Sequence, residues 1–560
     1  MSRHPQQGPI PNRRQLLAGG AALVLIPPAC GRSNPLETAL IGGRFWTGNP
    51  YAPRTDAIGI IGGRIVSIGA LAVQAGTSSK TRVIDLDGAF AMPAFIDNHT
   101  HFLKAAMALA QPDLLNVQTR NEFVQRIAVA ASAYPGRWIT GQSWDEQRMG
   151  GVLPSRDWID AVTPNTPVAV PRTDLHLLLL NSLALALAGI NRDTPDPPGG
   201  MIVRDADGEP TGILKDNAKL LVERVIPEPS ADEEELALKG AIDLCHKNGV
   251  AQVHIPEIDW KAHEALRRSS VAQDKGLRFY SMVPLQDWEK LARSIDNEGT
   301  GDQWVRWGGV KGLADGSLGS RTALFYQAYT DDMHTSGFRV MPRDELAYAV
   351  EQADRAGLHV AVHAIGDYAN DDVLNIFSDV AKKNGPRDRR FRIEHAQHLR
   401  PASIPRFAEQ RVIASVQPYH AIDDGRWAVN RIGPKRLEGT YAFAALIRSG
   451  ARVTFGSDWP VAPISPLIGI HAAVTRRTID NANPDGWLPD QKTTIEEAMR
   501  AYTVENAYAG FQDTVTGKLQ PGCFADIAVL SDDLTALSDD FIRDVDVLQT
   551  IVGGDIKYSA

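Results

Sequence analysis

The chain has 560 residues, of which 43% are hydrophobic and 22% are charged, and this composition predicts a globular protein with a large core. The formal net charge is -9, and the basic residues form no cluster interleaved with aromatic residues, so we expect no nucleic-acid partner. The cysteines Cys30, Cys245 and Cys523 form no Cys-x-x-Cys pair and no disulfide framework, so any metal site must use His, Asp, Glu or Lys.

Residues 1–34 are typical of an export signal. Arg13 and Arg14 precede an apolar run from Leu16 to Ile26, about half the length that a membrane-spanning helix needs. Paired arginines before a weakly hydrophobic run predict twin-arginine export to the periplasm or cell envelope, and an ordinary secretory signal is the alternative. The segment PPAC also resembles a lipoprotein cleavage box with Cys30 as the acylated residue. A lipid anchor at Cys30 is the one membrane attachment that we consider.

Both ends of the mature chain have the pattern of short β-strands separated by glycine turns. Residues 35–91 contain LIGGRFWTG and AIGIIGGRIVSIGA, and residues 515–560 contain ADIAVLSDD and VLQTIVGGDIKYSA. We therefore expect these two segments to fold together into one small β-sandwich.

Residues 92–514 alternate apolar, strand-like runs with amphipathic helical stretches, which is the pattern of a parallel α/β fold. Eight strands joined by helical crossovers predict a TIM barrel. The expected strands are Ala94–Asn98, Val250–Ile255, Leu277–Val283, Val305–Leu313, Leu358–His363, Phe391–Glu394, Val412–Gln417 and Arg452–Gly456. The interval between the first two strands is too long for one crossover, so we expect an inserted subdomain over about residues 112–240 that distorts the barrel.

Polar side chains stand toward the ends of these strands, where the active site of a TIM barrel lies. His99 and His101 are two residues apart, so on a strand both side chains would point toward one metal ion. Lys311 lies within an apolar strand, where a charged amine is costly unless it is paired or neutralised. Each candidate has an ordinary structural interpretation by itself, such as a hydrogen-bonded histidine or a turn aspartate. The full candidate set is His99, His101, Lys311, His363, His395 and Asp458.

Together, four histidines, a lysine and an aspartate at the ends of barrel strands predict a centre for one or two divalent metal ions. We expect zinc, although these ligand types also suit manganese, iron or cobalt. Carboxylation of the Lys311 amine by CO2 would turn a buried cation into an anionic oxygen ligand that bridges two metals. This hypothesis would explain why a lysine is tolerated inside the barrel.

Several segments resemble the metal-dependent amidohydrolase superfamily, and within it amidohydrolase family 3, the YtcJ-like proteins and N-substituted formamide deformylases. The similar segments are FIDNHTHF, VKGLADGSLGSRTA, HVAVHAIGDYA, RIEHAQ and TFGSDWPV, and the likeness runs from Ala39 to the C-terminus. It implies a distorted TIM barrel, a flanking β-sandwich, and a metal site at the six candidate residues. Ala94 stands where the family usually has glycine, a departure that should leave the ligands undisturbed.

The resemblance also implies a hydrolase that cleaves a non-peptide C–N bond, in an amide, formamide or N-acyl compound, by metal-activated hydroxide. Asp458 would take the proton of the attacking water and pass it to the leaving amine, with His395 beside it in the catalytic centre. The alternatives are a deaminase or a cyclic amide or ester hydrolase on the same scaffold, and a non-catalytic exported binding or regulatory protein. Lys311 counts against a simple one-metal deaminase, which usually lacks this lysine.

Contacts to a small-molecule substrate are expected from the insertion and from the segment after the seventh strand. The candidates are Trp144, Asp145 and His176 in the insertion, and Gln417, Tyr419 and His420 after the strand. Alternatively, Trp144 packs the subdomain and His176 caps a strand. We expect His254, His359 and His471 to be structural.

Overall fold

The computed structural model describes residues 35–560, apart from residues 110, 115, 134, 142, 173–176, 198, 199, 257 and 258. The expected export signal, with its candidate lipid anchor at Cys30, lies outside the described residues and stays a prediction, as does the role of His176. Within the described part of the chain, every helix is too short or too polar to cross a membrane.

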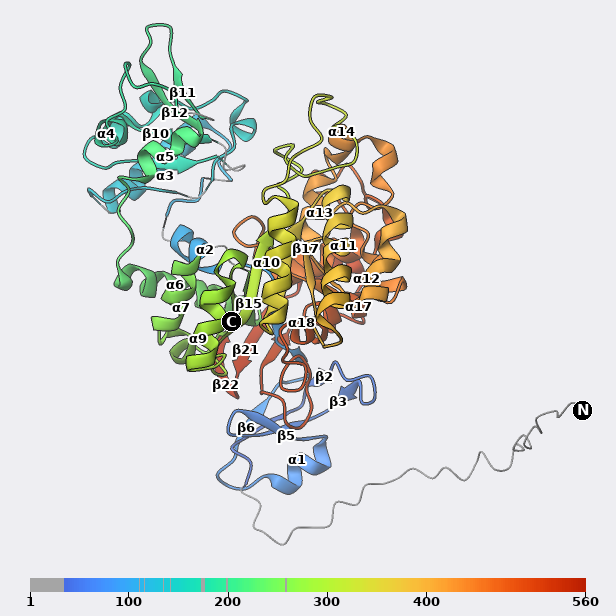
Figure 1. Ribbon diagram of the computed structural model, residues 1–560. Coiled ribbons are helices and arrows are strands. Elements are labelled where there is room, and N and C mark those ends of the chain that lie inside the picture. The colour runs from blue at the N-terminus through green and yellow to red at the C-terminus, as the bar shows by residue number, and fades with distance from the viewer. Residues whose placement is uncertain are drawn as a thin grey trace, which may run out of the picture.

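An eight-stranded parallel sheet forms the centre of the molecule, and each strand pairs with the next barrel strand along the chain (Figure 1). The strands are β8 (Phe95–Asp97), β13 (Val250–Pro256), β14 (Arg278–Pro284), β15 (Val305–Leu313), β16 (His359–Ala364), β17 (Arg392–His395), β18 (Ile413–Val416) and β19 (Val453–Phe455). Because both faces of such a sheet are covered, strands such as β13, β17 and β18 are buried throughout. The eight strands match the predicted ones, and the prediction of a distorted TIM barrel is confirmed.

Helices surround the barrel, and the amphipathic ones bury an apolar stripe against it. In α10, for example, Leu346, Ala349, Val350 and Ala353 follow the helical repeat and are buried. The barrel helices are α2 (Phe102–Leu109), α6 (Ala231–Lys247), α7 (Trp260–Arg268), α8 (Val271–Lys275), α9 (Trp288–Glu298), α10 (Arg343–Arg355), α11 (Asp367–Asn384), α12 (Ile404–Gln410), α13 (Pro418–Asp424), α14 (Ala428–Ile432), α15 (Phe443–Arg448), α16 (Pro466–Thr475), α17 (Ile495–Ala501) and α18 (Val504–Ala509).

The first and last barrel strands, β8 and β19, meet at a seam. The backbone bond from Asn98 N to Phe455 O is long, at 3.4 Å, whereas that from Asp458 N to His99 O, just beyond the strands, is 2.7 Å. The seam is therefore held most closely at its C-terminal end, by the residues that sequence analysis marks as ligands.

Strands from both ends of the chain share a six-stranded sheet, in which β7 pairs with β2 from the N-terminal part and with β20 from the C-terminal part. Its strands are β2 (Arg44–Trp46), β3 (Arg54–Thr55), β7 (Phe90–Pro93), β20 (Ile527–Leu530), β21 (Val547–Val552) and β22 (Asp555–Ser559). A second, four-stranded sheet contains β1 (Thr38–Ile41), β4 (Ile58–Ile61), β5 (Arg64–Ile68) and β6 (Arg82–Asp85), and α1 (Ala70–Gly76) joins β5 to β6.

The two sheets enclose a core of their own, with residues such as Phe45, Ile60, Ile527 and Ile551. A single residue, Ala94, separates β7 from the first barrel strand. The sandwich must therefore lie at the N-terminal end of the barrel, away from the ends of the strands that carry the candidate ligands.

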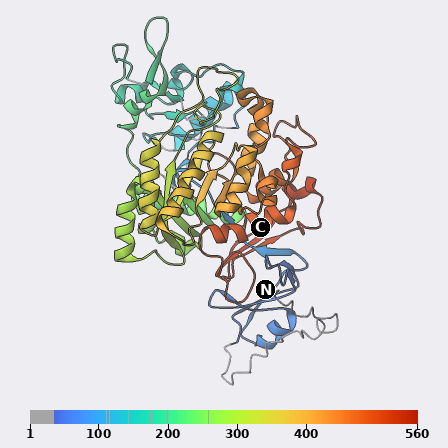
Figure 2. The ribbon, with the colours of Figure 1, turned by 45° about the vertical axis from the view of Figure 1, so that its right-hand side comes forward.

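The inserted subdomain stands at the opposite end of the barrel from the sandwich (Figure 1 and Figure 2). It contains α3 (Arg120–Ala133), β9 (Ala169–Pro171), β10 (Leu177–Leu180), α4 (Ser182–Leu187), β11 (Gly200–Arg204), β12 (Pro210–Asp216) and α5 (Leu220–Glu223), with short 3-10 turns at Glu146–Met149, Arg156–Trp158, Asp160–Val162 and Asn217–Lys219. The predicted end of the insertion near residue 240 is too late. Helix α6 runs unbroken through Gly240 and buries Leu238 and Ala241 in the main barrel core.

Candidate metal centre

The six candidate ligands lie at or near the C-terminal ends of their strands and come from five different strands. His99 and His101 follow β8, Lys311 lies in β15, His363 in β16, His395 ends β17, and Asp458 follows β19. The ring centroids of His99 and His395 are 4.9 Å apart, those of His363 and His395 are 4.5 Å apart, and those of His99 and His101 are 5.7 Å apart. The barrel thus brings together histidines that are up to 296 positions apart in the chain.

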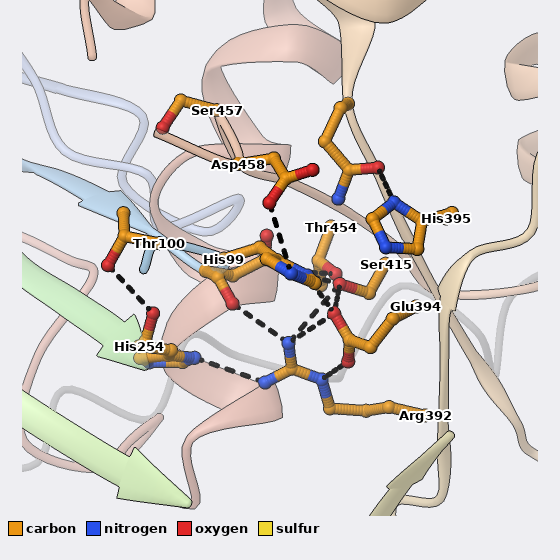
Figure 3. Close-up of polar contacts among 12 residues, drawn as sticks. His99, Thr100, His254, Arg392, Glu394, His395, Ser415, Thr454, Ser457 and Asp458 are labelled. Carbon is orange, nitrogen blue, oxygen red and sulfur yellow. Dashed lines mark hydrogen bonds and ion pairs between the residues drawn. The ribbon is translucent and has the colours of Figure 1, made fainter. Parts of the chain in front are cut away.

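Asp458 contacts His99, as Figure 3 shows, and also approaches two histidines outside that view. Its Oδ1 atom lies 3.5 Å from His99 Nε2 and 3.3 Å from His101 Nε2, and its Oδ2 atom lies 3.8 Å from His420 Nε2. Two groups of ligand atoms have all members within 4.8 Å of one another: His99, His101 and Asp458, and His395, His420 and Asp458. One carboxylate therefore belongs to both groups, as it would if two neighbouring cations shared it.

Three atoms of this cluster are buried and have no hydrogen-bond partner among the described residues. They are His99 Nε2, His420 Nε2 and Asp458 Oδ1. A buried polar atom left without a partner costs about 1–3 kcal/mol, so three of them close together require an explanation. Neutral imidazole nitrogens and carboxylate oxygens are ligands of zinc and similar divalent ions. The donor set therefore fits a divalent metal.

In the rings of His99 and His395, a hydrogen bond at Nδ1 determines which nitrogen is left for the metal. His99 Nδ1 lies 2.6 Å from Glu394 Oε2, and His395 Nδ1 lies 2.8 Å from Gln417 Oε1. Since both partners are acceptors, Nδ1 carries the hydrogen in each ring, and the lone pair is on Nε2.

The loop after β15 determines which nitrogen of His363 is left for the metal, by bonding to the other ring nitrogen, Nε2. His363 Nε2 donates to Gly316 O at 3.0 Å, which places the lone pair on Nδ1. The Asp315 carboxylate fixes this loop by accepting backbone hydrogen bonds from Leu324 at 2.8 Å and from Ile365 at 2.9 Å. Burial raises the pKa of Asp315 to about 7 in spite of these bonds.

Burial and nearby charges set the ionisation of the site. Burial lowers the pKa of His99, and the charge of Lys311 lowers it further. The same two causes lower the pKa of His363 to about 3. Burial alone would raise the pKa of Asp458, but His99 and His101 outweigh it and hold this pKa well below its ordinary value. Neutral imidazoles beside an ionised carboxylate are the protonation states that metal binding requires.

The backbone at two of the candidate ligands is strained. His395 has a φ of 74° and Asp458 a φ of 62°, in the left-handed region that residues other than glycine rarely adopt. Such a conformation costs about 1–3 kcal/mol and occurs most often at functional sites.

The segment after β18 places two of its predicted side chains, Gln417 and His420, beside candidate ligands. Gln417 accepts from His395, and its Nε2 atom is buried without a partner among the described residues. His420 faces Asp458 from α13. Burial raises the pKa of Tyr419, on the same helix, and the charge of Arg148 opposes that rise. Arg148 belongs to the insertion, so the insertion approaches the barrel at α13.

The insertion residues have partners within their own subdomain. Trp144 is 0% exposed, belongs to the subdomain's apolar core, and donates from Nε1 to Val170 O at 2.9 Å. This placement contradicts a direct substrate contact and agrees with the packing alternative, because a fully enclosed indole cannot reach a ligand. Asp145 lies 3.7 Å from Arg172 and 4.0 Å from Arg148, both in the insertion.

Sequence analysis missed Glu394, although it touches a candidate ligand. Glu394 and Arg392 are 0% exposed, and they form an ion pair with distances of 2.7 and 3.1 Å. The signal was present in RIEHAQ, where two charged residues lie inside a short buried strand. This is the same signal that singled out Lys311.

Expected structural roles of other histidines agree with their surroundings. Arg392 Nη1 lies 3.3 Å from His254 Nδ1, and His359 bonds to Tyr280 and to the carbonyl of Arg390. His471 is buried in α16.

Known proteins resemble the chain over most of its length. Protein LONG AFTER FAR-RED 3 of Arabidopsis thaliana is 38% identical over 550 residues, which cover 95% of this chain and 93% of the relative. N-substituted formamide deformylase of Arthrobacter pascens is 27% identical, with 90% of this chain and 95% of the relative covered. The crystal structure of a metal-dependent hydrolase from Pyrococcus furiosus superposes with a TM-score of 0.74 at 30% identity, covering 89% of this chain and 99% of that one.

The Amidohydrolase family matches residues 82–558, which include the whole barrel, the insertion and all six candidate ligands. The family predicted from the sequence motifs is thereby confirmed. This chain belongs to amidohydrolase family 3 and is a metal-dependent hydrolase.

Proposed function

We propose that the protein hydrolyses a non-peptide C–N bond in a small amide, formamide or N-acyl compound. The observation that carries this proposal is the convergence of His99 Nε2 and Asp458 Oδ1, both buried and without a hydrogen-bond partner among the described residues, beside the buried His420 Nε2. The name of the Arthrobacter pascens relative, an N-substituted formamide deformylase, supports a C–N bond as the target.

A divalent metal, when bound by these residues, lowers the pKa of a water and polarises a carbonyl oxygen. The residues that would hold it are His99, His101, Lys311, His363, His395 and Asp458. We propose zinc as the metal and a carbamate on the Lys311 amine as a bridging ligand. Lys311 is only 3% exposed, and it lies close enough to His99 and His363 for its charge to lower the pKa of both histidines. This placement supports the bridging role.

Asp458 performs the proton transfers. Its carboxylate accepts a proton from the attacking water as the new O–C bond forms at the acyl carbon. It then donates that proton to the amine nitrogen as the C–N bond breaks, so that the products are a carboxylate and an amine. The lowered pKa of Asp458 means that the carboxylate is ionised at neutral pH, which accepting the water's proton requires.

Gln417 and His420 position the acyl group. Gln417 Nε2 is a buried amide donor without a partner among the described residues, and His420 Nε2 lies 3.8 Å from Asp458 Oδ2. A donor held in a water-poor site stabilises negative charge on the acyl oxygen in the transition state more strongly than water does.

The test is amine release from a panel of N-formyl, N-acetyl and longer N-acyl amines and amino acids, using the zinc-loaded protein. Asp458→Asn is the negative control, and Lys104→Ala, an exposed substitution on α2, is the positive control. We expect amine release by the wild type and by Lys104→Ala, with a preference for one acyl length. Silence of the wild type across the panel, with metal bound, would contradict the proposal. Ammonia release from an aminated ring would instead identify a deaminase.

A further inference from the structure

We propose that Glu394 is a positioning residue for metal binding, which together with Arg392 fixes the His99 ring so that Nε2 faces the metal. This inference rests on the proposed metal centre and adds residues that lie behind it. It concerns the chain's own hydrogen bonds, which Figure 3 shows.

Glu394 Oε2 lies 2.6 Å from His99 Nδ1, and both side chains are 0% exposed. The Arg392 guanidinium donates to both carboxylate oxygens of Glu394, from Nε to Oε1 at 2.7 Å and from Nη2 to Oε2 at 3.1 Å, and this pairing keeps the carboxylate ionised. An ionised carboxylate can only accept, so the His99 hydrogen is held on Nδ1. A carboxylate in this place also increases the electron-donating strength of the opposite nitrogen.

Arg392 extends this control to the backbone of the first barrel strand. Its Nη2 atom donates to Asn98 O at 2.8 Å, next to His99 in the chain. The pair Arg392–Glu394 therefore holds His99 at two points, the preceding carbonyl and the ring. Ser415 completes the unit by donating from Oγ to Glu394 Oε2 at 2.6 Å.

The location of Arg392, Glu394 and Ser415 explains why His99 needs these side-chain hydrogen bonds. This unit starts from β17, which is separated from β8 by β18 and β19 when the barrel is followed across the seam, and it reaches across the barrel interior to that seam. At the seam, the backbone bond from Asn98 N to Phe455 O is long, at 3.4 Å, and the close bond from Asp458 N to His99 O at 2.7 Å holds the backbone but not the His99 ring. Side-chain hydrogen bonds from β17 and β18 supply the missing constraint.

A second buried pair separates this role from ordinary stabilisation. Arg278 and Asp526 form a two-bond ion pair at 2.8 and 3.0 Å, also buried, between the barrel and the sandwich. Removing one partner of either pair leaves a buried charge and should destabilise the fold. Of the two pairs, only Arg392–Glu394 touches a candidate ligand.

The experiment measures the zinc dissociation constant of metal-depleted full-length protein, in competition with a chromogenic chelator, together with the melting temperature. The variants are Glu394→Gln, which removes the charge, and Glu394→Asp, which keeps the charge beside Arg392 but shortens the reach to His99. Asp526→Asn is the matched control. We expect both Glu394 variants to bind zinc about 10- to 100-fold more weakly, the range typical of outer-shell partners. Asp526→Asn should lower the melting temperature and leave the zinc affinity within about twofold of the wild-type value.

Wild-type zinc affinity in both Glu394 variants would overturn this inference and leave the metal centre intact. It would also be overturned if Asp526→Asn lost zinc affinity in proportion to its melting temperature, because affinity would then follow global stability. A wild-type protein that bound no zinc would overturn the proposed centre and this inference together. Glu394→Asp keeps the test valid if Glu394→Gln does not fold, since its buried charges stay paired.

Discussion

Strand β16 carries two histidines on the same face, one near each end, and their ring nitrogens have different surroundings. At the start of the strand, His359 Nε2 donates to Arg390 O at 2.8 Å, and the Tyr280 hydroxyl lies 3.0 Å from Nδ1. Four residues on, His363 Nε2 donates to Gly316 O, and Nδ1 keeps its lone pair in the candidate metal centre.

Ionisation does not distinguish these two histidines, although His359 is buried and His363 is only partly buried. Burial lowers the pKa of each to about 3, helped by Arg392 at His359 and by Lys311 at His363. Hydrogen-bond partners do distinguish His359 from the histidines of the candidate metal centre. The N-terminal histidine has a partner on each nitrogen, whereas the C-terminal end contains buried atoms such as His99 Nε2 without one among the described residues. This difference agrees with the division of a TIM barrel into a stabilising end and a reactive end.

The largest expected effect comes from Asp458→Asn at the reactive end. The amide cannot accept the water's proton, so kcat should fall on the order of 10³-fold, within the range of general acid–base catalysis. The measurement is amine release at saturating substrate, with circular dichroism to confirm folding. His359→Gln, at the other end of the barrel, should keep kcat within about threefold, because it touches no candidate ligand. Turnover of Asp458→Asn near the wild-type rate would remove Asp458 from its proposed role.

Lys311→Ala should act on metal content. Loss of a bridging oxygen ligand should weaken zinc binding by about 100-fold or more, beyond the effect of an outer-shell partner. Formate or acetate should restore part of the metal, because a small carboxylate can occupy the vacated space. Elemental analysis after dialysis at limiting zinc measures both effects, with Lys104→Ala as the control. Full occupancy in Lys311→Ala, with no response to carboxylates, would argue against a bridging carbamate.

The sequence was sufficient to predict the barrel, because each strand is a short apolar run and the helices between them have clear amphipathic patterns. The candidate ligands could be found for the same reason, since a polar residue at the end of an apolar run is visible in the sequence. The end of the insertion could not be found, because α6 contains Gly240, which local pattern alone suggests as a boundary.

The pairing of each ligand with its partner was beyond sequence analysis, although the sequence contained a signal for Glu394 itself. The bond between His99 and Glu394 joins residues 295 positions apart, and that between His363 and Gly316 uses a backbone carbonyl, which has no sequence signature. Composition gives the inventory of polar groups, but only the fold shows which of them are paired.

A substitution at the stabilising end of the barrel should lower the stability of the fold and leave kcat nearly unchanged. His359→Gln should lower the free energy of unfolding by about 1–3 kcal/mol at pH 7.5, because Tyr280 and the Arg390 carbonyl lose a well-placed partner. Urea unfolding of the metal-depleted protein measures this change. A loss of kcat without loss of stability would contradict the assignment of His359 to the fold.

The same variant should also change the pH dependence of stability. In the folded protein the pKa of His359 is about 3, below its ordinary value of 6.5, because burial disfavours the charged ring. Between these two values the unfolded chain binds the additional proton, so the free energy of unfolding falls as the pH decreases from 6.5 toward 3. One such histidine contributes up to about 1.4 kcal/mol per pH unit, and His359→Gln should lose that contribution. Equal slopes in both proteins would contradict the lowered pKa.

The smallest effect is expected in the insertion, where the hydrogen-bond partner of Trp144 can be compared with those of the barrel histidines. Trp144 resembles His359 rather than His363, because it is fully buried and its Nε1–H has a partner in Val170 O. Trp144→Phe should therefore lower the free energy of unfolding by about 1 kcal/mol, the value of one hydrogen bond, and leave KM unchanged. A stable Trp144→Phe protein whose KM rose severalfold would show that the insertion rearranges to bring this indole to the substrate. In that case, a buried side chain whose polar atoms all have hydrogen-bond partners could be assigned a structural role only if the surrounding elements stay fixed, as barrel strands do.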